Sequence, residues 1–161
     1  MTIIPLTKTH WPVVEKIYLE GISTEQATFE TESPGWAKWN LSHHLKCRFA
    51  AVSNGTVVGW VALSPVSNRV VYFGVAEVSF YIAPTHKGRG IGQELLEHLI
   101  KVAEKEGYYS LQAVMFPENL ATLRLHEKCG FRKIGLKEKV AKLNGVWRNT
   151  VLYERRSKSI L

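Results

Sequence analysis

The sequence predicts a single domain, residues 1–161, of the α/β (α+β) class, in which helices cover both faces of a mixed, mostly antiparallel central sheet in three α/β/α layers. Strand-like segments flank Asn54-Gly55 and again Asn144-Gly145, and Asn-Gly is typical of two-residue hairpin turns. Apolar residues also recur at helical spacing from Ile91 to Ala103. With 161 residues, of which 45% are hydrophobic, the chain can bury one core without disulfides or a metal.

The first half of the chain predicts two helices and three adjacent antiparallel strands after a short first strand. Val13, Val14 and Ile17 fall on one helical face, with Thr9 as the N-cap. Pro84 ends the last of these strands, because proline cannot donate a ladder hydrogen bond. The expected elements are a strand at Thr2–Leu6, a helix after Thr9, a short helix at Trp36–Leu45, and strands at Phe49–Ser53, Thr56–Leu63 and Val75–Ile82.

The second half predicts two more helices and three strands. Gly107 and Gly130 end the helices, since glycine commonly follows a helix C-terminus, and Asn119 is a good N-cap for the second. The expected elements are a helix from Ile91 to Gly107, a strand at Leu111–Phe116, a helix from Asn119 to Gly130, and hairpin strands at Phe131–Val140 and Val146–Glu154. This order fits neither a Rossmann fold nor a helical bundle.

The composition of the chain indicates which kinds of partner the protein is expected to bind. The formal charge is +7, but the basic residues are scattered, so no helix or strand carries the basic face that a nucleic-acid partner needs. A small polyphosphate ligand would account for part of the excess. Cys47 and Cys129 lack metal-ligand spacing and are expected to be reduced core thiols. No apolar run is long enough to span a membrane, so we expect a cytoplasmic protein without a membrane or metal partner.

The segment Lys87–Gly92 (KGRGIG) follows a predicted strand and opens the most amphipathic helix. Glycines let the backbone approach a ligand closely, and a helix N-terminus offers unpaired N–H groups that suit phosphate oxygens. The P-loop spelling is absent, and Gln93 stands where the dinucleotide fingerprint requires a third glycine. Taken alone, the segment fits a phosphate-bearing ligand and a flexible surface turn equally well.

This segment resembles the phosphate-binding signature of the GNAT superfamily of acyl-CoA-dependent N-acyltransferases, which reads Gln or Arg, two residues, Gly, one residue, then Gly or Ala. Lys87, Gly90 and Gly92 match it, with Lys as a departure at the first place. The segment Asn119–Phe131 is similar to the family's helix and Gly-Phe pair near the C-terminus. The resemblance spans nearly the whole chain and implies the GNAT fold.

Three shorter segments resemble the branch that contains phosphinothricin and methionine sulfoximine N-acetyltransferases: Ala27–Thr31, Gly74–Ile82 and Gly145–Arg148. The resemblance implies direct transfer of an acetyl group from acetyl-CoA to the α-amine of a small amino acid or analogue. It also implies a cofactor strand whose backbone pairs with the pantetheine arm. The residues that it implies for acetyl-CoA binding are Phe80, Tyr81, Ile82, Lys87, Gly88, Arg89, Gly90, Ile91, Gly92, Gln93 and Asn119.

Amide formation from a thioester needs a neutral amine and a protonated leaving thiol. Glu77 lies in an otherwise apolar strand segment, where a carboxylate would have a raised pKa, and the resemblance makes it the general base. Strict alternation, which puts Glu77, Ser79 and Tyr81 on one face, allows a plain surface carboxylate instead. His126 stands where many members carry a Tyr thought to protonate the sulfur, so acid, base, coenzyme A contact and packing roles all stay open.

The acceptor site is less defined. Arg69 is the natural bidentate clamp for a carboxylate, and Trp60 is a further pocket candidate. The substrate-binding residues that we expect are Phe29, Ser67, Arg69, Glu77, Val78, Ser79 and Trp147. Two other functions stay open, a protein or peptide N-terminal acetyltransferase and a non-catalytic module that binds coenzyme A or nucleic acid. Members of the resembling family often form dimers, but no interface can be located in the sequence.

Overall fold

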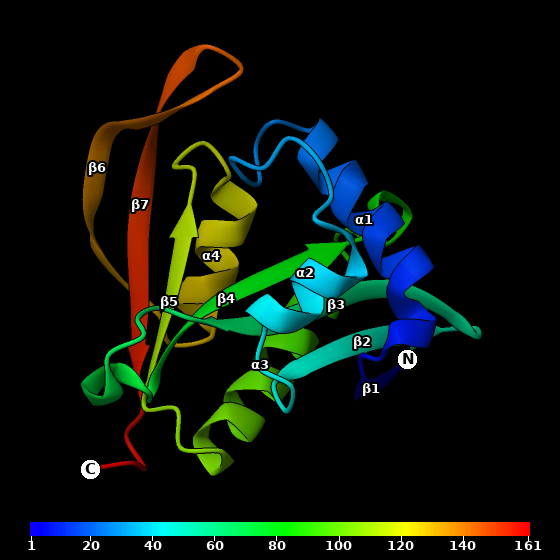
Figure 1. Cartoon of the computed structure of the whole chain (residues 1–161), viewed down its shortest axis with the longest axis horizontal. Coiled ribbons are helices and arrows are strands. Elements are labelled where there is room, and N and C mark those ends of the chain that lie inside the picture. The colour runs from blue at the N-terminus through cyan, green and yellow to red at the C-terminus, as the bar shows by residue number, and fades with distance from the viewer.

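The computed structural model describes all 161 residues as a seven-stranded sheet with helices on both faces (Figure 1). The strand order is β1-β2-β3-β4-β5-β7-β6. The strands are β1 Thr2–Pro5, β2 Arg48–Ser53, β3 Thr56–Pro65, β4 Val75–Ile82, β5 Ser110–Met115, β6 Arg132–Leu143 and β7 Val146–Arg156. The helices are α1 Trp11–Ser23, α2 Gly35–Ser42, α3 Ile91–Lys105 and α4 Leu120–Lys128. The mixed, mostly antiparallel sheet in three layers is confirmed.

Both Asn-Gly hairpins form as predicted. Asn54 and Gly55 have φ of 49° and 76°, and Asn144 and Gly145 have φ of 47° and 79°. A type I′ turn needs positive φ at both central residues, and Asn and Gly tolerate that conformation best. The hairpins therefore set the antiparallel pairs β2 with β3 and β6 with β7.

Alternating side chains divide the sheet into two cores. On β3, Val57 and Trp60 pack with α1 and α2, whereas Val58, Val61 and Leu63 point to the opposite face and pack with α3. Successive side chains alternate between the faces from Trp60 to Leu63. The β2–β3 register shifts where Ala51 pairs with Gly59 but Val52 pairs with Val57, and this irregularity puts Val57 on the same face as Trp60. Both faces of β3 are thus buried, which explains its nearly continuous apolar sequence.

Two helix boundaries differ from the predictions. Thr9 is not the N-cap of α1, because Thr7 opens a 3₁₀ turn at Lys8–His10 and its backbone N–H donates to the His10 ring at 3.0 Å. Thr9 lies inside that turn. The second helix ends at Ser42, before Leu45, because His43 adopts an extended conformation and its Nδ1 donates to the Trp39 carbonyl at 2.7 Å.

The feature that positions the site is the short contact between β4 and β5. They are the only parallel neighbours in the sheet. They pair at just three positions, Val75 with Ser110, Ala76 with Leu111 and Glu77 with Gln112. Beyond Glu77 the two strands diverge, as Figure 1 shows, and α4 lies beside the gap. The β4 edge from Val78 to Ile82 consequently keeps backbone groups that no strand of this chain satisfies.

Candidate functional site

A cavity of about 1050 Å³ lies where β4 and β5 separate. Glu77 to Ile82 of β4 and Ala113 to Met115 of β5 form its two strand walls. The start of α3, the exposed side of α4 and the loop after α1 complete the lining. The cavity therefore brings together the glycine segment, Glu77, His126 and Asn119, which the sequence predicts as one site.

The glycine segment forms an open cradle at the N-terminus of α3. Gly90 is the N-cap of α3 with φ of 81° and ψ of 0°, and Gly88 has φ of 76°. A Cβ built on either glycine would meet no protein atom within 4 Å, and both glycines line the cavity. No side chain caps the first N–H groups of α3. Free N–H groups, a positive helix end and room for a ligand fit phosphate oxygens.

Gly92 is needed for a different reason, the close packing of α3 against β4 and α4. A Cβ at this position would come within 3.1 Å of Leu125 and 3.3 Å of Phe80. Ile91 anchors the same turn in the core, and Gln93 lines the cavity. The glycine at 92 thus keeps the cradle next to the free edge of β4.

Glu77 lines the cavity where the two strands begin to separate and is the last β4 residue that pairs with β5. Its neighbours across the sheet are Ser64 of β3 and Gln112 of β5. Desolvation by burial raises the pKa of this carboxyl above its ordinary value. The face alternation expected for β4 is present, because Val78 packs in the core under α3 and Tyr81 packs on the α1 side. Glu77 is half-buried and lines the cavity on the face of β4 that it shares with Tyr81.

His126 is buried, 2% exposed, between Phe80 and Phe131, whose ring centroids lie 5.6 Å and 5.0 Å away. Its Nδ1 lies 2.8 Å from the Thr122 carbonyl oxygen, which can only accept, so Nδ1 carries the hydrogen. Burial lowers the pKa of this imidazole, which favours the neutral form. Nε2 therefore carries the lone pair; this atom is buried, and no group of the chain donates to it.

Asn119 caps α4 as predicted, because its Oδ1 accepts from the Thr122 backbone N–H at 3.4 Å. Its Nδ2 donates to the Gln26 carbonyl at 3.4 Å and so ties α4 to the loop after α1. One side chain thus serves both the helix and the cavity wall.

Replacing Asn119 by alanine should lower the free energy of unfolding by about 1 kcal/mol, since an N-cap and one loop contact are lost. Urea denaturation followed by circular dichroism measures this. Asn68→Ala is the control, because Asn68 is exposed in the loop before β4 and makes no side-chain hydrogen bond. Equal stability of the two variants would contradict the cap.

The loop that follows α1 forms a further wall of the cavity, where we expected Phe29 to bind the acceptor. Thr24 and residues 26–30 line it, and the Phe29 ring meets Phe116 at 5.0 Å in an edge-to-face contact. Tyr81 closes this side, and its ring packs so near Gly21 that a Cβ there would lie 2.4 Å away. The carboxylates of Glu30, Glu77 and Glu118 also line the cavity.

Several predicted residues do not reach the cavity. Ser67 and Arg69 lie in the loop before β4, at the end of that strand opposite the opening, and the Arg69 guanidinium sits 5.6 Å from the Tyr72 ring centroid. Trp60 is 1% exposed in the core under α1. Trp147 is exposed on the β6–β7 hairpin beneath Lys142. Arg89 is also exposed and outside the lining. Val78 and Ser79 do line it, as predicted.

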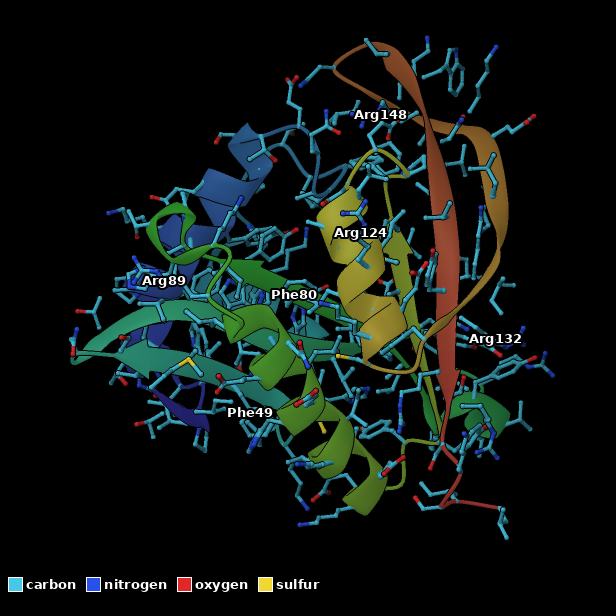
Figure 2. All side chains as sticks on the ribbon, turned by 180° about the vertical axis from the view of Figure 1, so that it is seen from behind. Phe49, Phe80, Arg89, Arg124, Arg132 and Arg148 are labelled. Atoms are coloured by element: carbon cyan, nitrogen blue, oxygen red, sulfur yellow. The ribbon has the colours of Figure 1, made fainter.

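Some cavity residues were not predicted. Thr28 and Glu30 belong to the segment Ala27–Thr31 that carries part of the resemblance, but no local pattern marks these two residues as lining a cavity. Phe116, Glu118 and Arg124 reach the cavity only because β5 ends beside α4. Figure 2 shows Arg124 on α4 and Phe80 near the start of α3.

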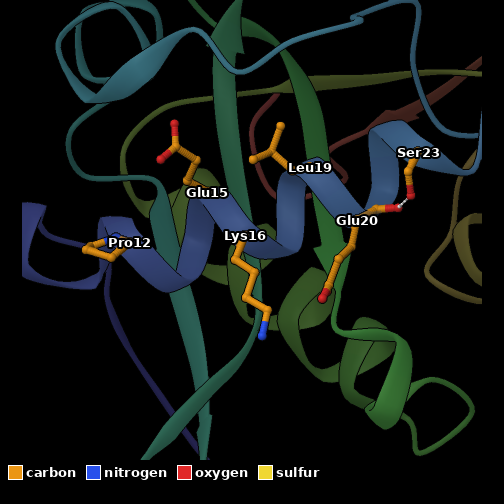
Figure 3. A pocket seen from close by; sticks show the side chains of 6 residues that line it. All are labelled: Pro12, Glu15, Lys16, Leu19, Glu20 and Ser23. Carbon is orange, nitrogen blue, oxygen red and sulfur yellow. Dashed lines mark hydrogen bonds between the residues drawn. The ribbon is translucent and has the colours of Figure 1, made fainter.

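A second hollow, of about 450 Å³, is found on the outer side of α1 (Figure 3). Its six lining residues all come from that one helix, and Leu19 is the only hydrophobic side chain among them. No second element faces them across a cleft, so this hollow is a helix surface and does not form a built site.

No helix in the structure is both long and apolar enough to cross a membrane.

Residues 11–131 match the family model described as "Acetyltransferase (GNAT) family". The protein YwnH of Bacillus subtilis (strain 168) is 34% identical over 137 residues, which cover 82% of this chain and 84% of that protein. A phosphinothricin N-acetyltransferase of Streptomyces viridochromogenes is 28% identical over 94% of this chain and 85% of its own. A Sinorhizobium meliloti phosphinothricin acetyltransferase solved with AcCoA superposes with a TM-score of 0.86 at 24% identity, over 99% of this chain and 94% of that one.

Proposed function

The chain belongs to the acetyltransferase (GNAT) family, and from that premise we propose that it transfers an acetyl group from acetyl-CoA to the α-amine of a small amino acid or analogue. The observation that carries the proposal is the partly buried Glu77 carboxylate in the same cavity as an open glycine cradle. The names of the relatives point to phosphinothricin and methionine sulfoximine as acceptors.

The donor side fits acetyl-CoA through features of this chain. Gly88 and Gly90 leave their backbone N–H groups accessible to phosphates, and Lys87 adds a positive charge. The free edge of β4 from Phe80 to Ile82 offers N–H and C=O groups to an extended ligand. When bound there, acetyl-CoA supplies the activated acetyl group as a thioester.

Glu77 prepares the acceptor in this proposal. An α-amine arrives as an ammonium group, which the carboxylates of the acceptor side attract, and it must lose a proton before it can attack a carbonyl carbon. The raised pKa of Glu77 makes its carboxylate a stronger base than an exposed glutamate. The neutral amine then forms the amide C–N bond as the thioester C–S bond breaks, and the second proton that the amine nitrogen loses balances the leaving thiolate, so that coenzyme A departs as its thiol. No covalent intermediate on Cys129 is required, and Cys129 does not line the cavity.

His126 acts beside the reacting groups as an acceptor. His126 lines the cavity, and its buried, unpartnered Nε2 would take a hydrogen bond from an N–H or S–H group that reaches it. The Thr122 carbonyl fixes the tautomer, and Phe80 and Phe131 fix the plane of the ring. Of the roles that the sequence leaves open for His126, we assign two: it accepts a hydrogen bond from a bound group, and it thereby orients that group.

The proposed function predicts release of coenzyme A thiol from acetyl-CoA only when an amino acid acceptor is present. A thiol-reactive dye measures this with free amino acids, phosphinothricin, methionine sulfoximine, a polyamine and a short peptide, each against a blank without acceptor. Release confined to the amino acids and their analogues is the expected result. Release with the peptide alone would replace the proposal by protein acetylation, and no release with any acceptor would contradict it.

A further inference from the structure

The guanidinium of Arg148 on β7 is held among four groups that do not belong to its own hairpin. It lies over the Phe116 ring at 4.0 Å and 3.6 Å from a Glu118 carboxylate oxygen. Nη1 donates to the Glu25 carbonyl at 2.7 Å, and Nη2 donates to Gln26 Oε1 at 3.0 Å. The side chain is only 13% exposed. Figure 2 shows Arg148 near the end of the β6–β7 hairpin, away from the labelled Arg132.

The loop that Arg148 holds is the acceptor wall of the cavity, residues 24–30 apart from Glu25. This loop has no helix or strand, and its own hydrogen bonds are local, such as Gln26 N–H to Thr24 Oγ1 and Glu30 N–H to Thr28 Oγ1. Its hydrogen bonds to the second half of the chain come from Arg148, Asn144 and Asn119. Arg148 makes two of these and also stacks on Phe116, the ring that Phe29 of the loop contacts.

We propose that Arg148 is a positioning residue that fixes the acceptor wall at residues 24–30 against the end of β5, and thereby sets which amine can reach Glu77. The inference rests on the proposed function, since it concerns the acceptor side of that site. Arg148 itself does not line the cavity, and its donors already have partners within the chain. It therefore acts through Gln26 and Phe116, which do line the cavity.

Arginine suits this position because one planar group stacks on an aromatic ring and donates from two nitrogens at once. Lysine keeps the charge near Glu118 but has neither the plane nor the fork. The donor side should be insensitive to the change, because none of the groups around Arg148 belongs to the glycine cradle at residues 87–92. The acceptor and the donor should consequently respond differently.

Replacing Arg148 by lysine is expected to raise KM for the amino acid acceptor by roughly 10-fold, while KM for acetyl-CoA stays within about twofold. Arg148→Ala should act in the same direction more strongly. Arg132→Ala is the matched control, because Arg132 belongs to the same hairpin but forms an exposed ion pair with Glu154 at 2.8 Å. It should leave both KM values unchanged.

Amide hydrogen exchange of the purified proteins gives a readout without turnover. Exchange in residues 24–30 should rise in Arg148→Lys and not in Arg132→Ala, with the rest of the sheet unchanged. An unchanged loop, or equal increases in KM for acceptor and donor, would overturn the inference. If the parent protein acetylates no amino acid, the proposed function fails, whereas the exchange comparison still decides whether Arg148 anchors the wall.

Discussion

Replacing Glu77 by glutamine is expected to lower kcat/KM for the amine acceptor by at least about 100-fold, the usual contribution of a general base. Glutamine keeps the size and a hydrogen-bonding group but cannot take a proton from the ammonium. Because the proposed role of Glu77 concerns the amine, and Glu77 is not part of the glycine cradle at residues 87–92, binding of acetyl-CoA should change little. Steady-state kinetics with the best acceptor and calorimetric titration of acetyl-CoA measure the two effects separately.

The pH dependence of kcat/KM in the parent enzyme tests the same role of Glu77. Burial raises the pKa of Glu77 above 4.5, so in the parent enzyme kcat/KM should fall as pH falls through that raised value. The acid limb should therefore lie at a higher pH than an unperturbed glutamate would give, and it should be absent from the residual activity of Glu77→Gln. A raised folded pKa also means that ionisation of Glu77 opposes folding above that pKa, so the variant should melt no lower than the parent at pH 7.

Glu138→Gln is the matched control for Glu77→Gln, since Glu138 is also a strand carboxylate but is exposed on β6 outside the cavity. Its kinetics and melting temperature should equal those of the parent. Near-parental turnover by Glu77→Gln would remove the general-base role and leave the carboxylate as an electrostatic or packing group.

The sequence predicts the parts of this fold that local chemistry determines. Both Asn-Gly turns, the strand Val75–Ile82 and the N-cap at Asn119 lie where their residues indicate. Thr9 is misleading because Thr7, two residues earlier, makes the competing turn with His10. Where two candidate capping residues lie within a few positions, the hydrogen bonds that form decide which one caps the turn, and the sequence pattern does not show which bonds these are.

Long-range pairing determines the rest of the site, and no local pattern encodes it. The cavity exists because β4 and β5 separate after Glu77, whose partner Gln112 is 35 positions further along the sequence. That geometry leaves Arg69 at the other end of β4 and brings Arg148 beside Glu25, 123 positions away. The roles of the individual site residues and the homodimer stay predictions.

Replacing Gly90 by valine should raise KM for acetyl-CoA by about 50-fold or more, which corresponds to roughly 2.3 kcal/mol. Gly90 has φ of 81°, a conformation that a β-branched residue strongly disfavours, so the turn before α3 must change. Valine methyl groups would also occupy the open space beside the N–H groups of the cradle. Both effects act on the donor side, so KM for the acceptor should change much less.

Gly55→Val separates the ligand effect from backbone strain. Gly55 has φ of 76° and equally open surroundings, but it lies in the β2–β3 turn, away from the cavity. Both variants should lose stability, since each forces a side chain into the left-handed region at a cost of about 1–2 kcal/mol. If Gly55→Val weakened acetyl-CoA binding as much as Gly90→Val, general destabilisation would explain both, and the cradle would lose its assigned role. A loss confined to Gly90→Val places the phosphates at the start of α3.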